Sequence, residues 1–140
     1  MKTGFLGLCT IFMLLLFQDA TAQSSTYWYN SGNDKGRLGD HRGAIRDYSK
    51  AIEMDPDYAD AYFSRAMSKT LLGDYQGAIQ DYNRVIKMDL DFTTAYKLRA
   101  MCKNELGDYR GAIQDCTKAI ELDPDFAEAY FNRGISKYEL

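Results

Sequence analysis

The chain has 140 residues, of which 46% are hydrophobic and 26% are charged, and its formal net charge is −3. This composition excludes a collagen-like or disordered chain. The lack of excess positive charge disfavours a nucleic-acid partner, because affinity for phosphates comes from clustered Lys and Arg. One histidine and three cysteines leave few ligands for a metal site. We therefore expect a folded chain with no nucleic-acid partner, no metal and no cofactor.

The first 22 residues have the pattern of a secretory signal peptide. A positively charged start (1–3) precedes an apolar run of 13 residues (5–17). As a helix, with about 1.5 Å of rise per residue, this run is too short to cross a hydrocarbon core of about 30 Å. Residues 20–22, Ala-Thr-Ala, supply the small-x-small pattern of a cleavage site. We predict a signal at 1–22, with a buried helix or short anchor as the alternative.

Cleavage would leave an exported mature chain, 23–140, either periplasmic or secreted. No second long apolar segment follows, so we expect no stable membrane span after cleavage. The short signal is similar to those of Gram-negative exported proteins, which favours the periplasm over a eukaryotic secretory route.

The rest of the chain repeats with a period of 34 residues. Blocks 25–58, 59–92 and 93–126 share eleven identical columns, and 127–140 begins a fourth block. Chance alone would give well under about one such column, so the repeat is real. We therefore predict one array of repeats across the mature chain.

Each block predicts two helices joined by Gly-Asp. In the second helix of the first block, Ala44, Tyr48 and Ala51 follow the spacing of one helix face. In the preceding Gly39-Asp40, the glycine can adopt a left-handed conformation and the aspartate can cap the next helix. Asp-Pro-Asp closes the first and third blocks, whereas the second has Asp-Leu-Asp, where we expect a weaker helix stop.

These features together resemble the tetratricopeptide repeat. The resemblance covers essentially all of the mature chain and depends on four recurring slots: aromatic (Trp28, Tyr62, Tyr96, Tyr130), small (Gly32, Ala66, Ala100, Gly134), alanine (Ala44, Ala78, Ala112) and proline (Pro56, Pro124). It implies an all-α, right-handed α-solenoid of antiparallel helix pairs, with about three and a half repeats and seven helices. It also implies that the first helix of each pair lines a concave groove.

The groove of this family is lined by alternate positions of each first helix. Here those positions form a strip rich in aromatic, methionine and asparagine residues: Tyr29, Asn30, Asn33, Phe63, Met67, Lys97, Met101, Phe131, Asn132 and Ile135. Such a strip suits an apolar peptide, whose backbone the asparagines can hydrogen-bond. We predict a non-catalytic adaptor or assembly scaffold that binds another exported protein.

Some members of the family bind the terminal carboxylates of chaperones with a set of Lys, Asn and Arg. The corresponding slots here hold Tyr29, Asn33, Ser64, Thr94 and Leu98. Only Asn33 matches, so we expect that specificity to be absent.

Catalytic residues are not indicated by the sequence. The single histidine, His41, lies in the Gly39–Gly43 turn and is interpreted as a surface residue. Cys102 and Cys116 form either a disulfide or two small core residues.

Two charged columns share the 34-residue period. Arg65, Arg99 and Arg133 recur with Asp47, Asp81 and Asp115, which favours ion pairs over a ladder for an anionic ligand. Lys35, Lys69, Lys103 and Lys137 are expected to cover the core with their stems and keep their charges in water.

The last block contains only a first helix, and its apolar face lacks the polar capping element usual in repeat arrays. Two alternatives to the adaptor follow from this. One is an N-terminal fragment of a longer exported protein, with a catalytic or signalling domain beyond Leu140. The other is a structural element that self-associates through the uncapped C-terminal helix.

Overall fold

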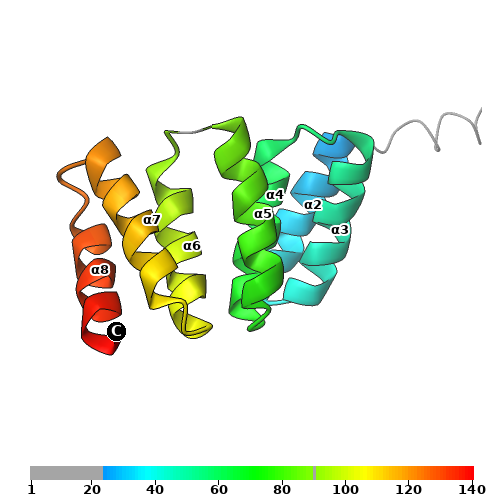
Figure 1. The fold of residues 1–140 in the computed structure, drawn as a ribbon. Helices are drawn as coiled ribbons and strands as arrows, with labels where there is room; N and C mark the ends of the chain where they lie inside the picture. Colours follow the sequence, from blue (N-terminus) through cyan, green and yellow to red (C-terminus); the bar gives the residue numbers. More distant parts are fainter. Residues whose placement is uncertain (1–23, 90) are drawn as a thin grey trace, which may run out of the picture.

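The computed structural model describes residues 24–89 and 91–140, so the predicted signal at 1–22 lies outside the described residues. The described part consists of seven α-helices and contains no β-strand: α2 (Ser25–Arg37), α3 (His41–Met54), α4 (Ala59–Leu71), α5 (Tyr75–Met88), α6 (Thr93–Glu105), α7 (Tyr109–Leu122) and α8 (Ala127–Glu139). Figure 1 shows a row of antiparallel hairpins running from α2 to α8. None of these helices is long and apolar enough to cross a membrane. The prediction of an all-α helical repeat is confirmed.

Contacts follow the order of the chain. Within each pair, α2 packs on α3, α4 on α5 and α6 on α7. Each second helix also packs on the next first helix. First helices meet directly as well, α2 with α4 and α6 with α8, so they share one side of the array.

The turn inside each pair is formed by glycine and aspartate, as predicted. Gly39, Gly73 and Gly107 have φ angles of 81°, 78° and 77°, a region that other residues rarely adopt. The carboxylates of the aspartates that follow accept a hydrogen bond from a backbone N–H three residues later, at 2.8–3.0 Å. This caps α3, α5 and α7.

The turn between pairs is closed by its first aspartate. Asp55, Asp89 and Asp123 each accept a hydrogen bond from the backbone N–H two residues later, at 3.1–3.2 Å. Helix α5 therefore ends at Met88, in register with Met54 of α3, although its turn lacks proline. The weaker stop expected in the second block is wrong, because the Asp-x-Asp pair ends the helix without the proline.

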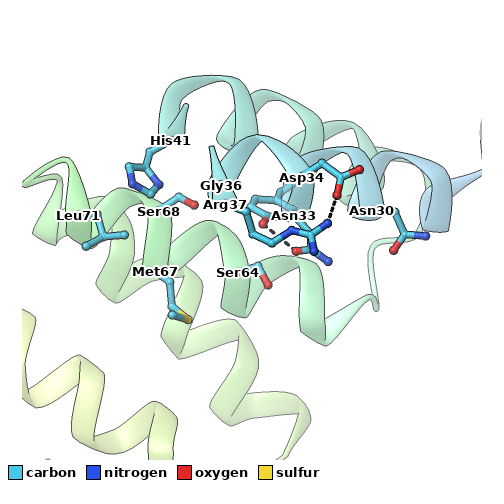
Figure 2. A pocket seen from close by; sticks show the side chains of 11 residues that line it. Asn30, Asn33, Asp34, Gly36, Arg37, His41, Ser64, Met67, Ser68 and Leu71 are labelled. Atoms are coloured by element: carbon cyan, nitrogen blue, oxygen red, sulfur yellow. Dashed lines mark hydrogen bonds and ion pairs between the residues drawn. The ribbon is translucent and has the colours of Figure 1, made fainter. Parts of the chain in front are cut away.

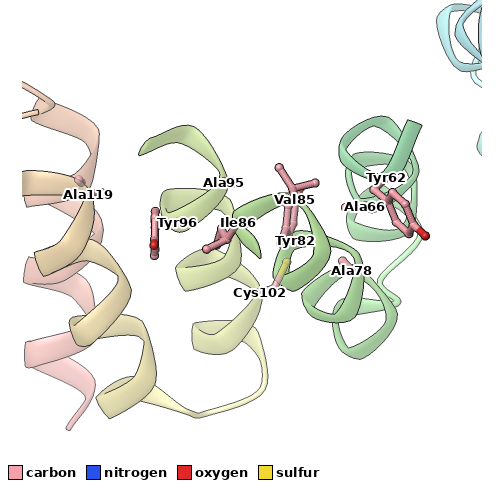
Figure 3. Close-up of a cluster of buried hydrophobic side chains, with 11 residues drawn as sticks. Tyr62, Ala66, Ala78, Tyr82, Val85, Ile86, Ala95, Tyr96, Cys102 and Ala119 are labelled. Atoms are coloured by element: carbon pink, nitrogen blue, oxygen red, sulfur yellow. The ribbon is translucent and has the colours of Figure 1, made fainter. Parts of the chain in front are cut away.

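The core is built from small residues and a few large rings. Figure 3 shows Tyr82 and Val85 of α5 beside Cys102 of α6, with Ala66 on α4 and Ala78 on α5 itself. All five are 0–1% exposed. The alanines let the helices approach closely, while Tyr82 fills the space between them.

Candidate functional site: the groove between the first helices

A pocket of about 650 Å³ lies between α2 and α4 (Figure 2). Three of the predicted groove residues, Asn30, Asn33 and Met67, line this pocket. Eight further residues complete its wall: Asp34, Gly36, Arg37, His41, Tyr48, Ser64, Ser68 and Leu71. The helical periodicity pointed to the middle of each first helix, so it missed Arg37 and Leu71 at the helix ends.

Tyr48 forms the floor of this first pocket. It is only 4% exposed, and its hydroxyl donates a 2.8 Å hydrogen bond to Oδ1 of Asn33. Burial raises the pKa of Tyr48, so the phenol stays neutral at physiological pH. The floor is therefore a neutral aromatic surface with one amide fixed at its edge.

The charges of the first pocket pair with each other. Arg37 donates to the carboxylate of Asp34 one helical turn earlier, and both side chains are exposed. His41 begins α3 and lines the same pocket, so its interpretation as a residue of the connecting turn is wrong. Its Nδ1 is buried with no hydrogen-bond partner among the described residues. His41 is therefore a polar residue of the first pocket that the sequence did not assign to the groove.

A second pocket of about 420 Å³ lies between α6 and α8. Four of the predicted groove residues line it, together with Ala127 and Glu128: Lys97, Met101, Phe131 and Asn132. The Nζ of Lys97 lies 2.9 Å from a carboxylate oxygen of Glu128 and 5.5 Å from the ring centre of Phe126. Phe131 and Met101 are 70% and 39% exposed, so apolar surface faces solvent here.

The remaining predicted groove residues lie outside both pockets. Tyr29 and Phe63 are half-buried, with ring centroids 5.0 Å from those of Tyr58 and Phe92 in the following turns. These two rings hold consecutive pairs together, which periodicity alone does not reveal. Ile135 is 40% exposed on α8.

The predicted ion pairs to the repeated aspartates form for Arg65 and Arg99, but among the described residues Arg133 has no such pair and instead lies 3.4 Å from Oγ1 of Thr117. Both Arg65 and Lys69 bind Asp81, with N–O distances of 2.6 Å and 2.8 Å. Arg99 and Lys103 bind the next aspartate, Asp115, at the same two distances. The expectation that Lys69 and Lys103 keep their charges in water is wrong, because their side chains are only 17% and 19% exposed.

Cys102 and Cys116 are free and fully buried, so the structure contains two core thiols in place of a disulfide. Burial raises the pKa of Cys102, and it raises the pKa of Cys116 to about 11. Both groups are therefore thiols at neutral pH, which is unsuited to nucleophilic chemistry. Within 24–89 and 91–140, no three His, Cys, Asp or Glu residues gather as a metal site.

Comparison with known proteins agrees with this architecture. Residues 29–102 match the tetratricopeptide repeat family, and residues 103–140 match a second description of the TPR repeat. A 50-residue stretch is 36% identical to an uncharacterized protein of Methanocaldococcus jannaschii, covering 36% of this chain and 58% of that relative. The match thus spans little more than half of the relative's length.

Solved structures with similar folds cover most of the chain. The TPR domain of Arabidopsis OM64 has a TM-score of 0.78 at 25% identity, covering 83% of this chain and 96% of its own. MamA has a TM-score of 0.81 at 22% identity, covering 86% and 70%. The first TPR of Spaghetti (RPAP3), bound to the HSP90 peptide SRMEEVD, has a TM-score of 0.78 at 24% identity, covering 84% and 93%. Since the family match covers 74 of 140 residues, the chain belongs to the tetratricopeptide repeat family.

Proposed function

We propose that this chain is a non-catalytic adaptor or assembly scaffold that binds a peptide segment of another protein along its first helices. The observation that carries the proposal is the pair of pockets between α2 and α4 and between α6 and α8. Each pocket combines an exposed methionine, Met67 or Met101, with asparagine amides. Flexible thioethers adapt to apolar side chains, and amides can pair with a peptide backbone.

The charge pattern favours a neutral peptide. Arg37 and Lys97, the cations of the two pockets, are paired with Asp34 and Glu128. A carboxylate-rich ligand would have to displace these partners. An uncharged, apolar segment requires no such exchange, so it fits the two pockets better.

The same reasoning separates this chain from peptide-bound relatives of similar fold. The Spaghetti (RPAP3) domain is bound to SRMEEVD, and a second human RPAP3 domain is in complex with the HSP70 peptide SGPTIEEVD. Of the five slots that bind such carboxylates in the family, only Asn33 matches here, and its Oδ1 is engaged by Tyr48. We infer that this groove takes a different class of peptide.

We further propose that the partner is met after export, in the periplasm or the secreted fraction. This part rests on the amino-terminal pattern alone, with its apolar run and Ala-Thr-Ala site. Amino-terminal sequencing of the chain recovered from its native host tests it. A mature terminus at Gln23 is the expected result, and an uncleaved terminus would contradict it.

The test of the groove uses three methionines of similar exposure. Met67 and Met101 are 44% and 39% exposed in the two pockets, while Met54 is 55% exposed at the end of α3 and outside both. The double substitution Met67→Glu with Met101→Glu places charge in both pockets without emptying the core. Met54→Glu is the matched control for an added surface charge.

Each variant is used as bait for native envelope or secretory extract, after its helicity and melting temperature have been checked. A partner retained by the parent and by Met54→Glu, but lost by the double variant, supports the groove. Equal recovery on all three baits would contradict it. The peptide SRMEEVD, titrated into the parent, should show no saturable binding, and tight binding would overturn the inference about ligand class.

A further inference from the structure

The first pocket differs in its side chains from the equivalent place one repeat later, between α4 and α6. Adding 34 to the number of a pocket residue gives its equivalent in that place. At four positions of the wall a larger or less polar side chain takes over there: Asn33 is replaced by Met67, His41 by Tyr75, Ser64 by Leu98 and Ser68 by Cys102. Because the helices repeat, the polar character of the first pocket comes from these four side chains.

Between α4 and α6 the larger side chains pack into the core. Leu98 and Tyr75 lie against the buried cluster that contains Tyr82, and Tyr82 itself is 0% exposed. In the first pocket, Ser64 stands at the position that Leu98 occupies in the next repeat, and the ring of Tyr48 lines the pocket. The size of one side chain on the second of the two helices therefore separates an open place from a filled one.

Two hydrogen-bonding groups border the hydroxyl of Tyr48 at the floor of the first pocket. This hydroxyl donates to Oδ1 of Asn33 at 2.8 Å, which leaves both N–H groups of the amide to donate elsewhere. They have no acceptor among residues 24–89 and 91–140. Burial raises the pKa of Tyr48, and the Ser64 hydroxyl opposes this in part as a hydrogen-bonding neighbour. The floor thus presents an amide N–H donor beside a hydroxyl oxygen that can accept.

His41 adds a third hydrogen-bonding group, at the end of the pocket where Leu71 also lies (Figure 2). Its Nδ1 is buried without a partner among the described residues. A buried imidazole nitrogen requires a donor or an acceptor, according to its tautomer. A ligand group that carries both can serve either tautomer.

The charges of the first pocket disfavour an ionised ligand group. Asp34 and Arg37 stand together in its wall as an ion pair. A ligand carboxylate would meet Asp34 and a ligand ammonium group would meet Arg37, whereas an uncharged group avoids both penalties. The lining therefore suits a neutral group with a donor and an acceptor. A carboxamide carries these on two separate atoms, while a hydroxyl has a single oxygen.

We propose that the first pocket binds the carboxamide side chain of an asparagine or glutamine in the peptide. Its carbonyl oxygen accepts a hydrogen bond from the amide of Asn33, and its amide nitrogen donates to the hydroxyl of Ser64, above the neutral ring of Tyr48. Ser64 is the specificity-determining residue, because a leucine at this position fills the space. This inference rests on the proposed function and names the ligand group that the groove selects.

A display library of random peptides, selected on the purified chain, provides the probe. The selected peptides should share an asparagine or a glutamine. Each is resynthesised with that residue replaced by the corresponding acid or by methionine. Either replacement should weaken binding to the parent chain at least tenfold in a titration, because the polar groups of the pocket then lose their partners.

Ser64→Leu and Asn33→Met introduce the side chains that the next repeat carries at the same positions, Leu98 and Met67. Both variants should therefore fold, and their melting temperatures check this. In both, the preference for the carboxamide over the acid and over methionine should disappear. Asn132→Leu is the matched control, because Asn132 occupies the column of Ser64 but lines the second pocket, and it should keep the preference.

Selected peptides whose acid and methionine analogues bind equally well would overturn this inference and leave the adaptor proposal standing. So would a preference that survives both pocket variants. If only methylation of the main-chain amides weakens binding, the main chain is the group bound, which also overturns it. Failure to select any peptide would contradict the proposed function itself, and this inference with it.

Discussion

The ring of Tyr48 packs so closely against Gly32 that no larger side chain fits at position 32 unless the ring moves. A Cβ on Gly32 would lie 2.6 Å from the ring of Tyr48, a distance that real Cβ contacts essentially never show. The ring also donates through its hydroxyl to Asn33, and so links the core to the first pocket. Side-chain volume at this one position therefore affects both stability and the groove.

Gly32→Ala is expected to lower the free energy of unfolding by about 1–3 kcal/mol, because the Tyr48 ring must move to accept the methyl group. Gly36→Ala is the matched control on the same helix, since its nearest contact would be 3.7 Å from the Tyr48 hydroxyl. It should leave stability unchanged or raise it by up to about 1 kcal/mol, from better helix propensity. Urea unfolding of both variants measures this, and equal effects would refute the steric explanation.

Asp47 is a buried carboxylate whose charge is stabilised by neighbours. Burial alone would raise the pKa of Asp47, but hydrogen bonds from Lys35 and Ser31, both 2.6 Å, outweigh this effect. The net pKa lies below the ordinary value of 3.8. A lowered pKa in the folded state adds stability above the unfolded pKa, and this stability is lost as pH falls through the folded pKa.

Asp47→Asn should therefore cost about 1–3 kcal/mol at pH 7, because Lys35 and Ser31 lose their charged acceptor. The gap between parent and variant should begin to shrink as the pH falls below about 4, where the aspartate of the unfolded chain binds a proton, and should continue to shrink as the pH falls through the lower pKa of the folded carboxylate. Urea midpoints measured between pH 7 and pH 3 check the trend. A gap that stays constant over this range would show that the charge of Asp47 contributes nothing.

Each helix pair begins and ends through short local patterns, and this explains why the elements were predictable from the sequence. Gly73 at a φ of 78° and the capping carboxylate of Asp74 define the turn from α4 to α5 without help from distant residues. The turn after α5 shows that proline is not required to end the second helix of a pair. Asp89 closes it in the same way as Asp55, whose turn contains Pro56.

Gly73→Ala should destabilise the chain by about 1–2 kcal/mol, because a side chain is strained in the left-handed region even where space is open. Gly73→Asn should cost less, since asparagine tolerates this conformation. Thermal or urea unfolding of the two variants gives the comparison. An alanine variant as stable as the asparagine variant would argue against a conformational requirement at this turn.

At the scale of the whole molecule, the 34-residue period predicted the pairing of helices and the side on which the first helices lie. The resemblance to the tetratricopeptide repeat assigned residues to one groove, of which Asn30, Asn33 and Met67 line the first pocket and Lys97 and Met101 line the second. These positions follow from helix periodicity, because each first helix presents the same face.

The rest depends on contacts between repeats, which a period does not contain. Tyr29 and Phe63 stack on rings from the following turn, and His41 reaches the first pocket from the start of α3. Lys69 and Arg65 lie one turn apart on α4, and both bind the buried Asp81 of α5. Each case joins residues from different helices, so column patterns alone could not predict it.

The central claim is that a partner lies along the pockets between the first helices. Methionine methyl groups labelled with ¹³C test it directly, because Met67 and Met101 line the pockets, whereas Met54 and half-buried Met88 do not. On adding a captured partner, the account predicts that the Met67 and Met101 signals shift while those of Met54 and Met88 stay in place. Binding that leaves Met67 and Met101 unshifted would contradict it.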